Sequence, residues 1–143
     1  MTDSSLITFH SENIPFELEN SNKVVDWICS TILTEKKFLG EISYIFCNDE
    51  YLHKMNVEYL NHDTLTDIIT FNYSKGNTLS ADIFISLERV KENANEFKVS
   101  FQDELHRVII HGILHLIGYD DKTDADKTAM RSKEDFYLSL RLI

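Results

Sequence analysis

Hydrophobic and polar residues repeat with two different periods along this chain, and the two periods separate strands from helices. Short runs of alternating, β-branched or aromatic residues predict four β-strands, at residues 6–10, 41–47, 68–73 and 81–87. Apolar residues recur every three or four positions in five longer segments, which predicts helices, at residues 23–33, 49–59, 87–97, 101–117 and 124–142. Residues 15–18 (PFEL) continue the first strand after a polar turn.

Turn and cap residues mark how these elements connect. The sequence Ser-Lys-Gly-Asn at residues 74–77 is typical of a hairpin turn, so the strands before and after it should pair antiparallel. Ser100 is placed to cap the fourth helix, and Gly118 to end it in a left-handed conformation. Strand, helix, strand, helix, two strands and three helices predict an α+β fold with a single small mixed β-sheet and helices packed on it.

The helical periods also predict which side chains face the sheet. In three of the helices one apolar stripe stands out. The expected packing residues are Val24, Trp27, Ile28, Thr31 and Ile32 in the first helix, Val90, Ala94 and Phe97 in the third, and Met130, Phe136, Leu138 and Leu142 in the last.

The whole-chain composition is that of one globular domain. At 143 residues with 43% hydrophobic residues, we expect a single domain over residues 1–143. No run approaches the eighteen apolar residues of a membrane span, and residues 1–10 lack the features of a secretory signal, so we expect a cytoplasmic protein without membrane contact. Cys29 and Cys47 have no paired spacing, which indicates buried thiols rather than a disulfide.

The net charge of −10 counts against broad nucleic-acid binding, which normally uses a basic surface. Any nucleic-acid contact must therefore be local, through a few basic residues, a metal ion or a partner.

Two histidines give the chain its clearest chemical signal. His111 and His115 lie four positions apart in the apolar stretch VIIHGILHLIGYDD (residues 108–121), so both imidazoles leave the same helix face. Gly118 can turn the chain back and bring an acidic side chain toward them, which would complete a three-ligand metal site with an open position. Buried histidines also serve as ordinary core residues with polar partners, and the spacing alone leaves the two readings about even.

The residue after the first histidine separates this stretch from the HExxH zinc proteases. Position 112 is glycine, so the glutamate that serves those proteases as general base is absent. A peptidase function loses its proton acceptor.

The same stretch resembles a known family. HGILHLIGYDD is similar to the HGxLHLxGYDH signature of the YbeY family of bacterial metal-dependent endoribonucleases, and residues 55–71 (MNVEYLNHDTLTDIITF) and 81–86 (ADIFIS) resemble the segments that precede it. The resemblance implies a zincin- or metzincin-like fold with the metal site at the end of a central helix. It implies a zinc-dependent endoribonuclease specific for single strands, which acts in 3' end maturation of small-subunit ribosomal RNA and in ribosome biogenesis. The small subunit or its assembly factors are the implied partners.

The resemblance assigns His111 and His115 to the first two zinc ligands. The family's third ligand is a histidine, and this chain has Asp121 at that position. A carboxylate is an acceptable zinc ligand, so we expect His111, His115 and Asp121 to hold one Zn²⁺, with Asp120 as the competing third ligand and Asp124 a weaker one. An anionic ligand should raise the pKa of a bound water and relax metal choice toward harder ions.

A second departure from the family concerns phosphate binding. Leu60 stands where the family usually has arginine, which leaves the strength of catalysis open; His62 and Lys75 are candidate substitutes. Thr66 and Asp67 match a pair that the family places near its cleft, and equally suit a turn that enters a strand. RNA contacts are expected from basic residues beside the site, Arg107, Lys122, Lys127 and Arg131.

Two alternatives remain open from the sequence. One is a non-enzymatic ribosome-assembly factor with a structural metal, which Leu60 favours. The other is a metallohydrolase of a different bond, such as a peptide or ester, which Gly112 disfavours. No catalytic residue beyond the metal ligands is predicted.

Overall fold

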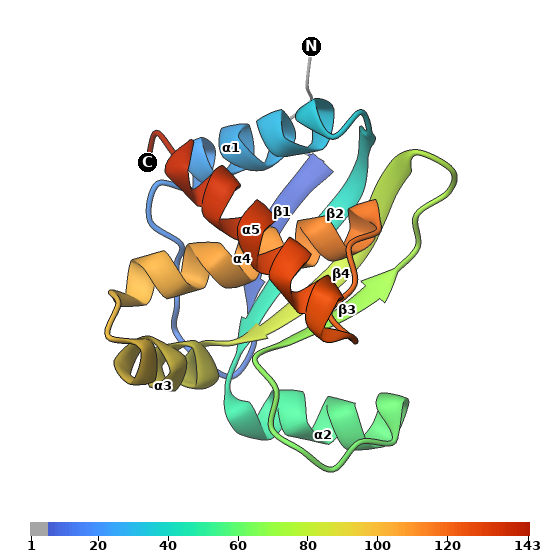
Figure 1. Ribbon diagram of the computed structural model, residues 1–143. Coiled ribbons are helices and arrows are strands. Elements are labelled where there is room, and N and C mark those ends of the chain that lie inside the picture. The colour runs from blue at the N-terminus through green and yellow to red at the C-terminus, as the bar shows by residue number, and fades with distance from the viewer. Residues whose placement is uncertain (1–5) are drawn as a thin grey trace.

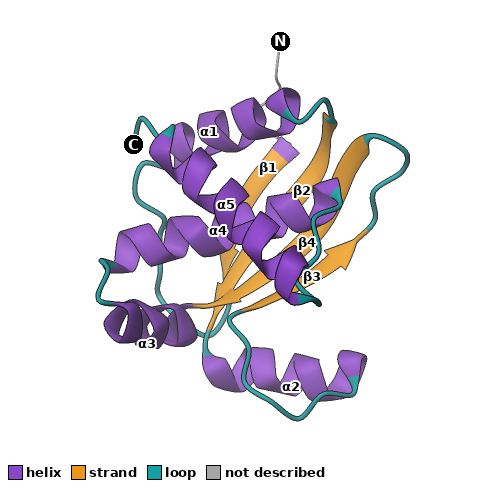
Figure 2. Cartoon of the chain, in the orientation of Figure 1, coloured by secondary structure: helices purple, strands orange, loops and turns teal. Residues whose placement is uncertain are grey.

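Within residues 6–143, four strands and five helices follow one another in the predicted order (Figures 1 and 2). The structure is a computed structural model that describes residues 6–143. The expectation that residues 1–10 are not a secretory signal falls partly on residues 1–5, which lie outside the described residues. The elements are β1 (Ile7–Ser11), α1 (Ser21–Thr34), β2 (Phe38–Cys47), α2 (Asp49–Leu60), β3 (Ile68–Asn72), β4 (Thr78–Ser86), α3 (Leu87–Phe97), α4 (Phe101–Ile117) and α5 (Asp124–Ser139).

The strands form one mixed sheet in the order β1-β2-β4-β3. β1 and β2 are parallel, as are β2 and β4, whereas β3 runs antiparallel to β4 with Ile68 opposite Ile85. The hairpin predicted from residues 74–77 is therefore confirmed. The α+β class with a single mixed sheet is confirmed as well.

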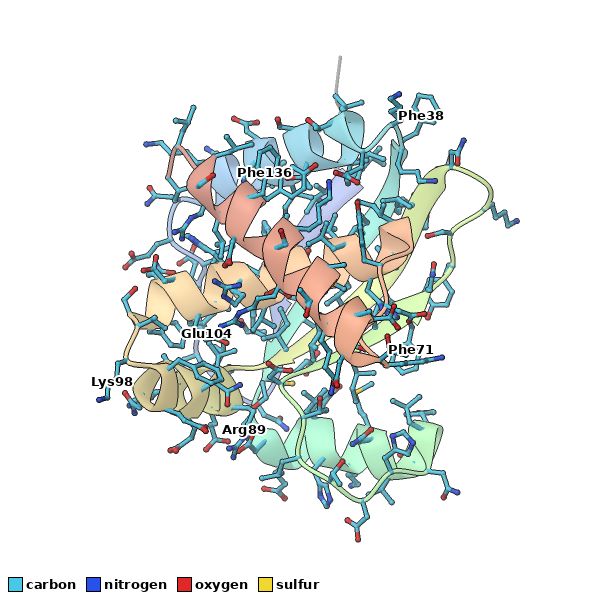
Figure 3. The ribbon with its side chains drawn as sticks, viewed as in Figure 1. Phe38, Phe71, Arg89, Lys98, Glu104 and Phe136 are labelled. Atoms are coloured by element: carbon cyan, nitrogen blue, oxygen red, sulfur yellow. The ribbon has the colours of Figure 1, made fainter. Side chains whose placement is uncertain are left out.

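The second strand begins earlier than its sequence predicts. The strand was predicted to start at residue 41, but β2 starts at Phe38, at the top of the sheet in Figure 3, and includes Gly40. The pairing with β4 is irregular between Leu39 and Ile42, and a Cβ atom at Gly40 would lie 2.6 Å from the Leu79 carbonyl oxygen. Glycine here permits a close approach of two backbones. Residues 15–18 form no strand.

Helices cover the two faces of the sheet unequally. α1 and α4 pack on one face, and α5 lies over α4 on the side away from the sheet (Figure 1). The main core lies between these layers, where the Tyr44 hydroxyl of β2 donates a hydrogen bond of 3.0 Å to the Ile109 carbonyl of α4. α2 covers part of the other face, around a smaller cluster of Cys47, Leu52 and Ile69.

The packing stripe of α1 is confirmed, but that of α5 is partly wrong. Met130 is buried as predicted, whereas Phe136 is 49% and Leu142 is 89% exposed. The helix ends at Ser139, and its buried stripe consists of Met130, Glu134 and Tyr137. The prediction used apolar residues alone. It therefore missed the buried face of α5, which includes the charged residue Glu134.

Two smaller predictions can also be compared with the fold. Val90 and Ala94 of α3 are buried as expected, but Phe97 is half-exposed. Cys29 and Cys47 are buried free thiols, as predicted. Among residues 6–143, no helix has the length and apolar character needed to cross a membrane.

Candidate functional site

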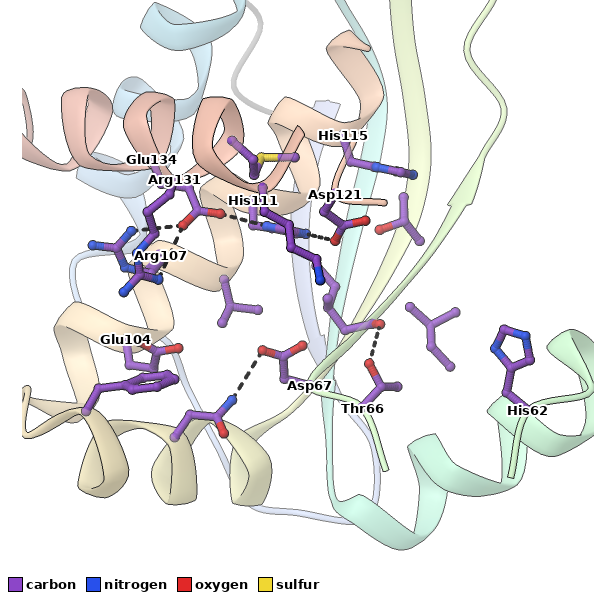
Figure 4. Close-up of a pocket in the computed structure, with 18 of the residues that line it drawn as sticks. His62, Thr66, Asp67, Glu104, Arg107, His111, His115, Asp121, Arg131 and Glu134 are labelled. Atoms are coloured by element: carbon purple, nitrogen blue, oxygen red, sulfur yellow. Dashed lines mark hydrogen bonds and ion pairs between the residues drawn. The ribbon is translucent and has the colours of Figure 1, made fainter. Parts of the chain in front are cut away.

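Helix α4 places both predicted histidines on the wall of one cleft (Figure 4). The Ser100 side chain caps the start of the helix by accepting a hydrogen bond of 3.1 Å from the Asp103 amide. Gly118, at φ 127°, ends it. Both boundaries agree with the sequence prediction, and they set His111 and His115 one turn apart near the end of the helix.

The cleft has a volume of about 730 Å³ and lies where α4, the first half of α5, α3 and β3 meet. Its lining combines histidines and carboxylates with basic and apolar side chains. The lining residues are Leu60, His62, Thr66, Asp67, Ile68, Ile69, Thr70, Asn93, Phe97, Glu104, Arg107, Val108, His111, His115, Asp121, Lys127, Met130, Arg131 and Glu134.

The ring of His111 is held from behind by a carboxylate of α5. Its Nδ1 lies 2.7 Å from Oε2 of Glu134. Burial lowers the pKa of His111, but the hydrogen bond and the charge of Glu134, with Asp121 and Asp67, outweigh it and raise the pKa above its usual value. Because an ionised carboxylate only accepts hydrogen bonds, Nδ1 carries a proton and Nε2 is the nitrogen that faces the cleft.

Asp121 is the acidic residue that the turn at Gly118 brings to His111. Its Oδ2 lies 3.5 Å from Nε2 of His111. Two ligand atoms bound to one tetrahedral zinc ion at about 2.05 Å each lie roughly 3.3 Å apart. Asp121 lines the cleft and Asp120 does not, so the geometry favours Asp121 of the two candidates.

His115 does not join this pair in the structure. The side chain is exposed, lines the same cleft, and points its ring away from His111 (Figure 4). Within residues 6–143, no three His, Cys, Asp or Glu side chains are gathered as they would be around a metal ion. The structure therefore brings two of the three predicted ligands together, and the complete ligand set stays a prediction.

Two further carboxylates line the cleft, Asp67 just before β3 and Glu104 near the start of α4. Asp67, which the sequence placed near the cleft, accepts a hydrogen bond of 3.4 Å from Asn93, and Glu104 is 4% exposed. Burial raises the pKa of both carboxyl groups above their usual values. In Asp67 the nearby charge of His111 opposes this rise.

Three of the four predicted basic residues line the cleft, and Lys122 is not among them. Arg107 is already engaged, at 2.9 Å from Glu134 and 2.7 Å from Asp135. Arg131 is 55% exposed, 4.0 Å from Glu134, and its guanidinium lies 5.9 Å from the centre of the Phe97 ring. Arg131 is therefore better placed than Arg107 to meet an incoming phosphate.

The residues around the missing family arginine are also resolved. Leu60 lines the cleft, so an apolar side chain occupies the place expected for a phosphate-binding one. His62 also lines it, whereas Lys75 lies in the hairpin region and does not. Of the two candidate substitutes, His62 is the one the fold places at the site.

Sequence reasoning missed Glu134 and Glu104, the two most buried carboxylates of the cleft. Glu134 contacts both His111 and Arg107, although 23 positions separate it from His111. Its sequence signal was weak but present, since it occupies the stripe shared by Met130 and Tyr137. A charged residue at a core position of a helix indicates a buried polar partner.

Fold and cleft together define a small α+β protein whose histidine-bearing helix and following acidic loop form one side of a polar cleft. The sequence model of the family described as Endoribonuclease YbeY matches residues 6–140. The chain belongs to this family, and the predicted enzyme class, an endoribonuclease, is confirmed with it.

Similar proteins extend the match over nearly the whole chain. A protein named Endoribonuclease YbeY from Flavobacterium johnsoniae is 60% identical over 130 residues, which are 91% of this chain and 93% of that protein. One of the same name from Bacteroides fragilis is 46% identical over 135 residues, 94% and 97% of the two chains. The solution structure of TM1509 from Thermotoga maritima superposes with a TM-score of 0.63 at 26% identity, covering 93% of this chain and 87% of that one.

Proposed function

We propose that this chain is a zinc-dependent endoribonuclease that cleaves single-stranded ribosomal RNA in the 3' end maturation of small-subunit rRNA. Family membership supports the nuclease chemistry. The observation that carries the metal dependence is the 3.5 Å separation of His111 Nε2 and Asp121 Oδ2. We further propose that residues 1–143 form one such domain, that it works in the cytoplasm in ribosome biogenesis, and that the small subunit or its assembly factors are its partners.

His111, His115 and Asp121 would hold the ion. Two imidazoles and one carboxylate match the ligand set of catalytic zinc sites, which leave a position for water or substrate. His115 is exposed, so its ring is free to adopt other rotamers. When bound, zinc would polarise a phosphoryl oxygen and lower the pKa of a water molecule.

The remaining cleft residues have supporting tasks in this proposal. Glu134 fixes the tautomer of His111 and aims Nε2 into the cleft. Asp67, whose buried carboxyl has a raised pKa, would hold a proton in the cleft and pass it to the leaving oxygen. Arg131 would neutralise charge on the phosphate. In the family this task would fall to the arginine that Leu60 replaces in this chain.

The structure adds an argument against the hydrolysis of peptides. Gly112 is buried, and a Cβ atom there would lie 3.2 Å from the side chains of Ile68 and Ile83. The position next to the first histidine therefore faces the sheet, where a general base could not reach the cleft. A non-enzymatic assembly factor remains the second candidate, because Leu60 leaves the cleft without one phosphate-binding side chain.

Metal content and RNA cleavage, measured on the same preparations, test the proposal. The wild type should retain about one Zn²⁺ per chain and cleave single-stranded rRNA fragments, and chelation should abolish cleavage. His115→Ala and Asp121→Ala should lose both properties, whereas Asp120→Ala should keep them. A greater loss of metal in Asp120→Ala than in Asp121→Ala would assign the third ligand to Asp120. Equal metal and cleavage in wild type and His115→Ala would contradict the mechanism, and tight zinc with no cleavage would favour the assembly factor.

A further inference from the structure

A cluster of four polar side chains lies behind the acidic loop, outside the cleft. Its centre is Glu35, the residue that follows α1, with a carboxylate side chain 11% exposed. The Tyr119 hydroxyl donates a hydrogen bond of 2.8 Å to one carboxylate oxygen. The other oxygen accepts from Lys133 at 3.2 Å and from the Tyr137 hydroxyl. Three segments far apart in sequence therefore meet at one carboxylate.

The charges in this cluster are balanced. Lys133 neutralises Glu35, and its ammonium also lies 5.7 Å from the centre of the Tyr119 ring. Burial raises the pKa of Glu35, but the hydrogen bonds from Tyr137, Tyr119 and Lys133 outweigh it, so the pKa lies below its usual value. The carboxylate is therefore ionised at neutral pH, when it is the strongest acceptor for the two hydroxyls.

Tyr119 is the member of this cluster that belongs to the loop between α4 and α5. Its amide donates to the Leu114 carbonyl at 3.1 Å, and its hydroxyl to Glu35. The far end of the loop is fixed by the capping box of Thr123 and Asp126. Asp121 lies between these two anchors. Its side chain is 50% exposed, and among the described residues it makes a polar contact with His111 alone. The position of Asp121 thus depends on its neighbours in the loop.

We propose that Glu35 is a positioning residue of the cleft, which holds the hydroxyl of Tyr119 and thereby fixes the loop so that Asp121 faces His111. The inference rests on the proposed function in taking Asp121 as a metal ligand. Lys133 holds the Glu35 carboxylate in place from α5 and still binds it when the Tyr137 hydroxyl, which shares the same oxygen, is removed. Tyr119 transmits the position of the carboxylate to the loop. Residues that orient metal ligands typically change metal affinity by about 10- to 100-fold when they are replaced.

Two tyrosines on the same carboxylate provide a matched pair of variants. Tyr119→Phe and Tyr137→Phe each remove one hydroxyl from Glu35, but only the first removes it from the loop. The readouts are the Zn²⁺ dissociation constant, from competition with a chromophoric chelator, and amide hydrogen exchange of residues 119–123 in the metal-free full-length protein. Denaturant unfolding of both variants checks that the comparison is made between folded proteins.

Tyr119→Phe should weaken Zn²⁺ binding about tenfold and accelerate exchange in residues 119–123. Tyr137→Phe should lower the denaturation midpoint as well, yet leave the zinc dissociation constant within about twofold of the wild type and the exchange of the loop unchanged. In a double-mutant cycle, Tyr119→Phe should have no further effect on zinc affinity once Asp121→Ala is present. Glu35→Gln, which keeps an acceptor oxygen, should retain more zinc affinity than Glu35→Ala.

Equal losses of zinc affinity in the two tyrosine variants would overturn the inference, because the cluster would then act through general stability alone. Unchanged amide hydrogen exchange of residues 119–123 in Tyr119→Phe would overturn the inference as well. If the wild type binds no Zn²⁺, the proposed function fails, and the exchange of residues 119–123 still decides separately whether Glu35 holds the loop.

Discussion

His111 of α4 and Glu134 of α5 form the contact that joins these two helices at the cleft, with Nδ1 and Oε2 2.7 Å apart. The Glu134 side chain is only 6% exposed and also binds Arg107, so a buried carboxylate joins a partly exposed imidazole and guanidinium in one network. A buried carboxylate is tolerated when its oxygens are paired in this way. The arrangement fixes the direction in which Nε2 points before any ligand enters the cleft.

Replacing Glu134 by glutamine should weaken zinc binding by about 10- to 100-fold, because the ring of His111 loses its ionised acceptor. Titration calorimetry or chelator competition measures the loss. The neighbouring Asp135→Asn is the matched control, since Asp135 also binds Arg107 at 2.7 Å but, among residues 6–143, contacts no histidine. Equal zinc affinities for Glu134→Gln and the wild type would refute this role.

Arg131→Gln should lower the affinity for single-stranded RNA and reduce the salt dependence of binding by about one phosphate contact. The reason is that Arg131 lines the cleft with an exposed guanidinium. Filter binding or fluorescence anisotropy at several salt concentrations gives the slope. Lys122→Gln makes the same change in charge outside the cleft lining, and its slope should match that of the wild type. If the two variants behave alike, net charge rather than position is responsible.

The protein should lose stability as pH falls from about 6.5 to about 4, because of His106. Burial, and then the charge of Arg141, lower the pKa of this buried histidine to about 4, against a smaller opposite effect of Asp103. The unfolded chain takes up a proton below about pH 6.5, whereas the folded protein does so only near pH 4. The contribution of neutral His106 to the free energy of unfolding is complete above pH 6.5. It decreases as pH falls from 6.5 to 4, by on the order of 3 kcal/mol in total.

Denaturant unfolding at a series of pH values measures this dependence. In His106→Leu the part of the slope due to the imidazole should disappear, whatever the change in absolute stability. His10→Gln, at an exposed position, serves as the control and should unfold with the slope of the wild type. A wild-type slope in His106→Leu would show that other groups cause the loss of stability in acid.

Gly112 should tolerate alanine but not glutamate. Alanine gains about 1 kcal/mol in helix propensity. Its methyl group would meet the terminal methyl groups of Ile68 and Ile83 at 3.2 Å and Cγ2 of Ile83 at 3.4 Å. The two effects oppose each other, so the free energy of unfolding should stay within about 1 kcal/mol. Glutamate would place an unpaired carboxylate against the sheet and should cost at least about 3 kcal/mol. Peptidase activity in a folded Gly112→Glu variant would contradict this placement.

The sequence was sufficient wherever a local pattern decides the structure. The hairpin at residues 74–77 and the two ends of α4 follow from turn and cap chemistry. The contact between His111 and Asp121 was anticipated because Gly118 reverses the chain within a few residues. Such features depend on neighbours along the chain, which a single sequence displays.

Features that depend on distant segments could not be read in the same way. Gly40 belongs to β2 because Leu79 of β4 approaches it closely, and no pattern around residue 40 indicates that neighbour. Glu134 faces the cleft because α5 crosses α4, and the apolar period alone pointed to Phe136 instead. The cluster at Glu35 joins three segments of the chain that lie close together only after folding.

The place of α5 in the chain has a consequence for the order in which the site is assembled during synthesis. The chain emerges from its N-terminus, so the helix with both histidines is made before Lys133, Glu134 and Tyr137. Until α5 docks, His111 lacks the carboxylate that orients it, and Glu35 lacks two of its three partners. A nascent or truncated chain that ends before residue 124 would carry all three expected metal ligands without the means to hold them in position.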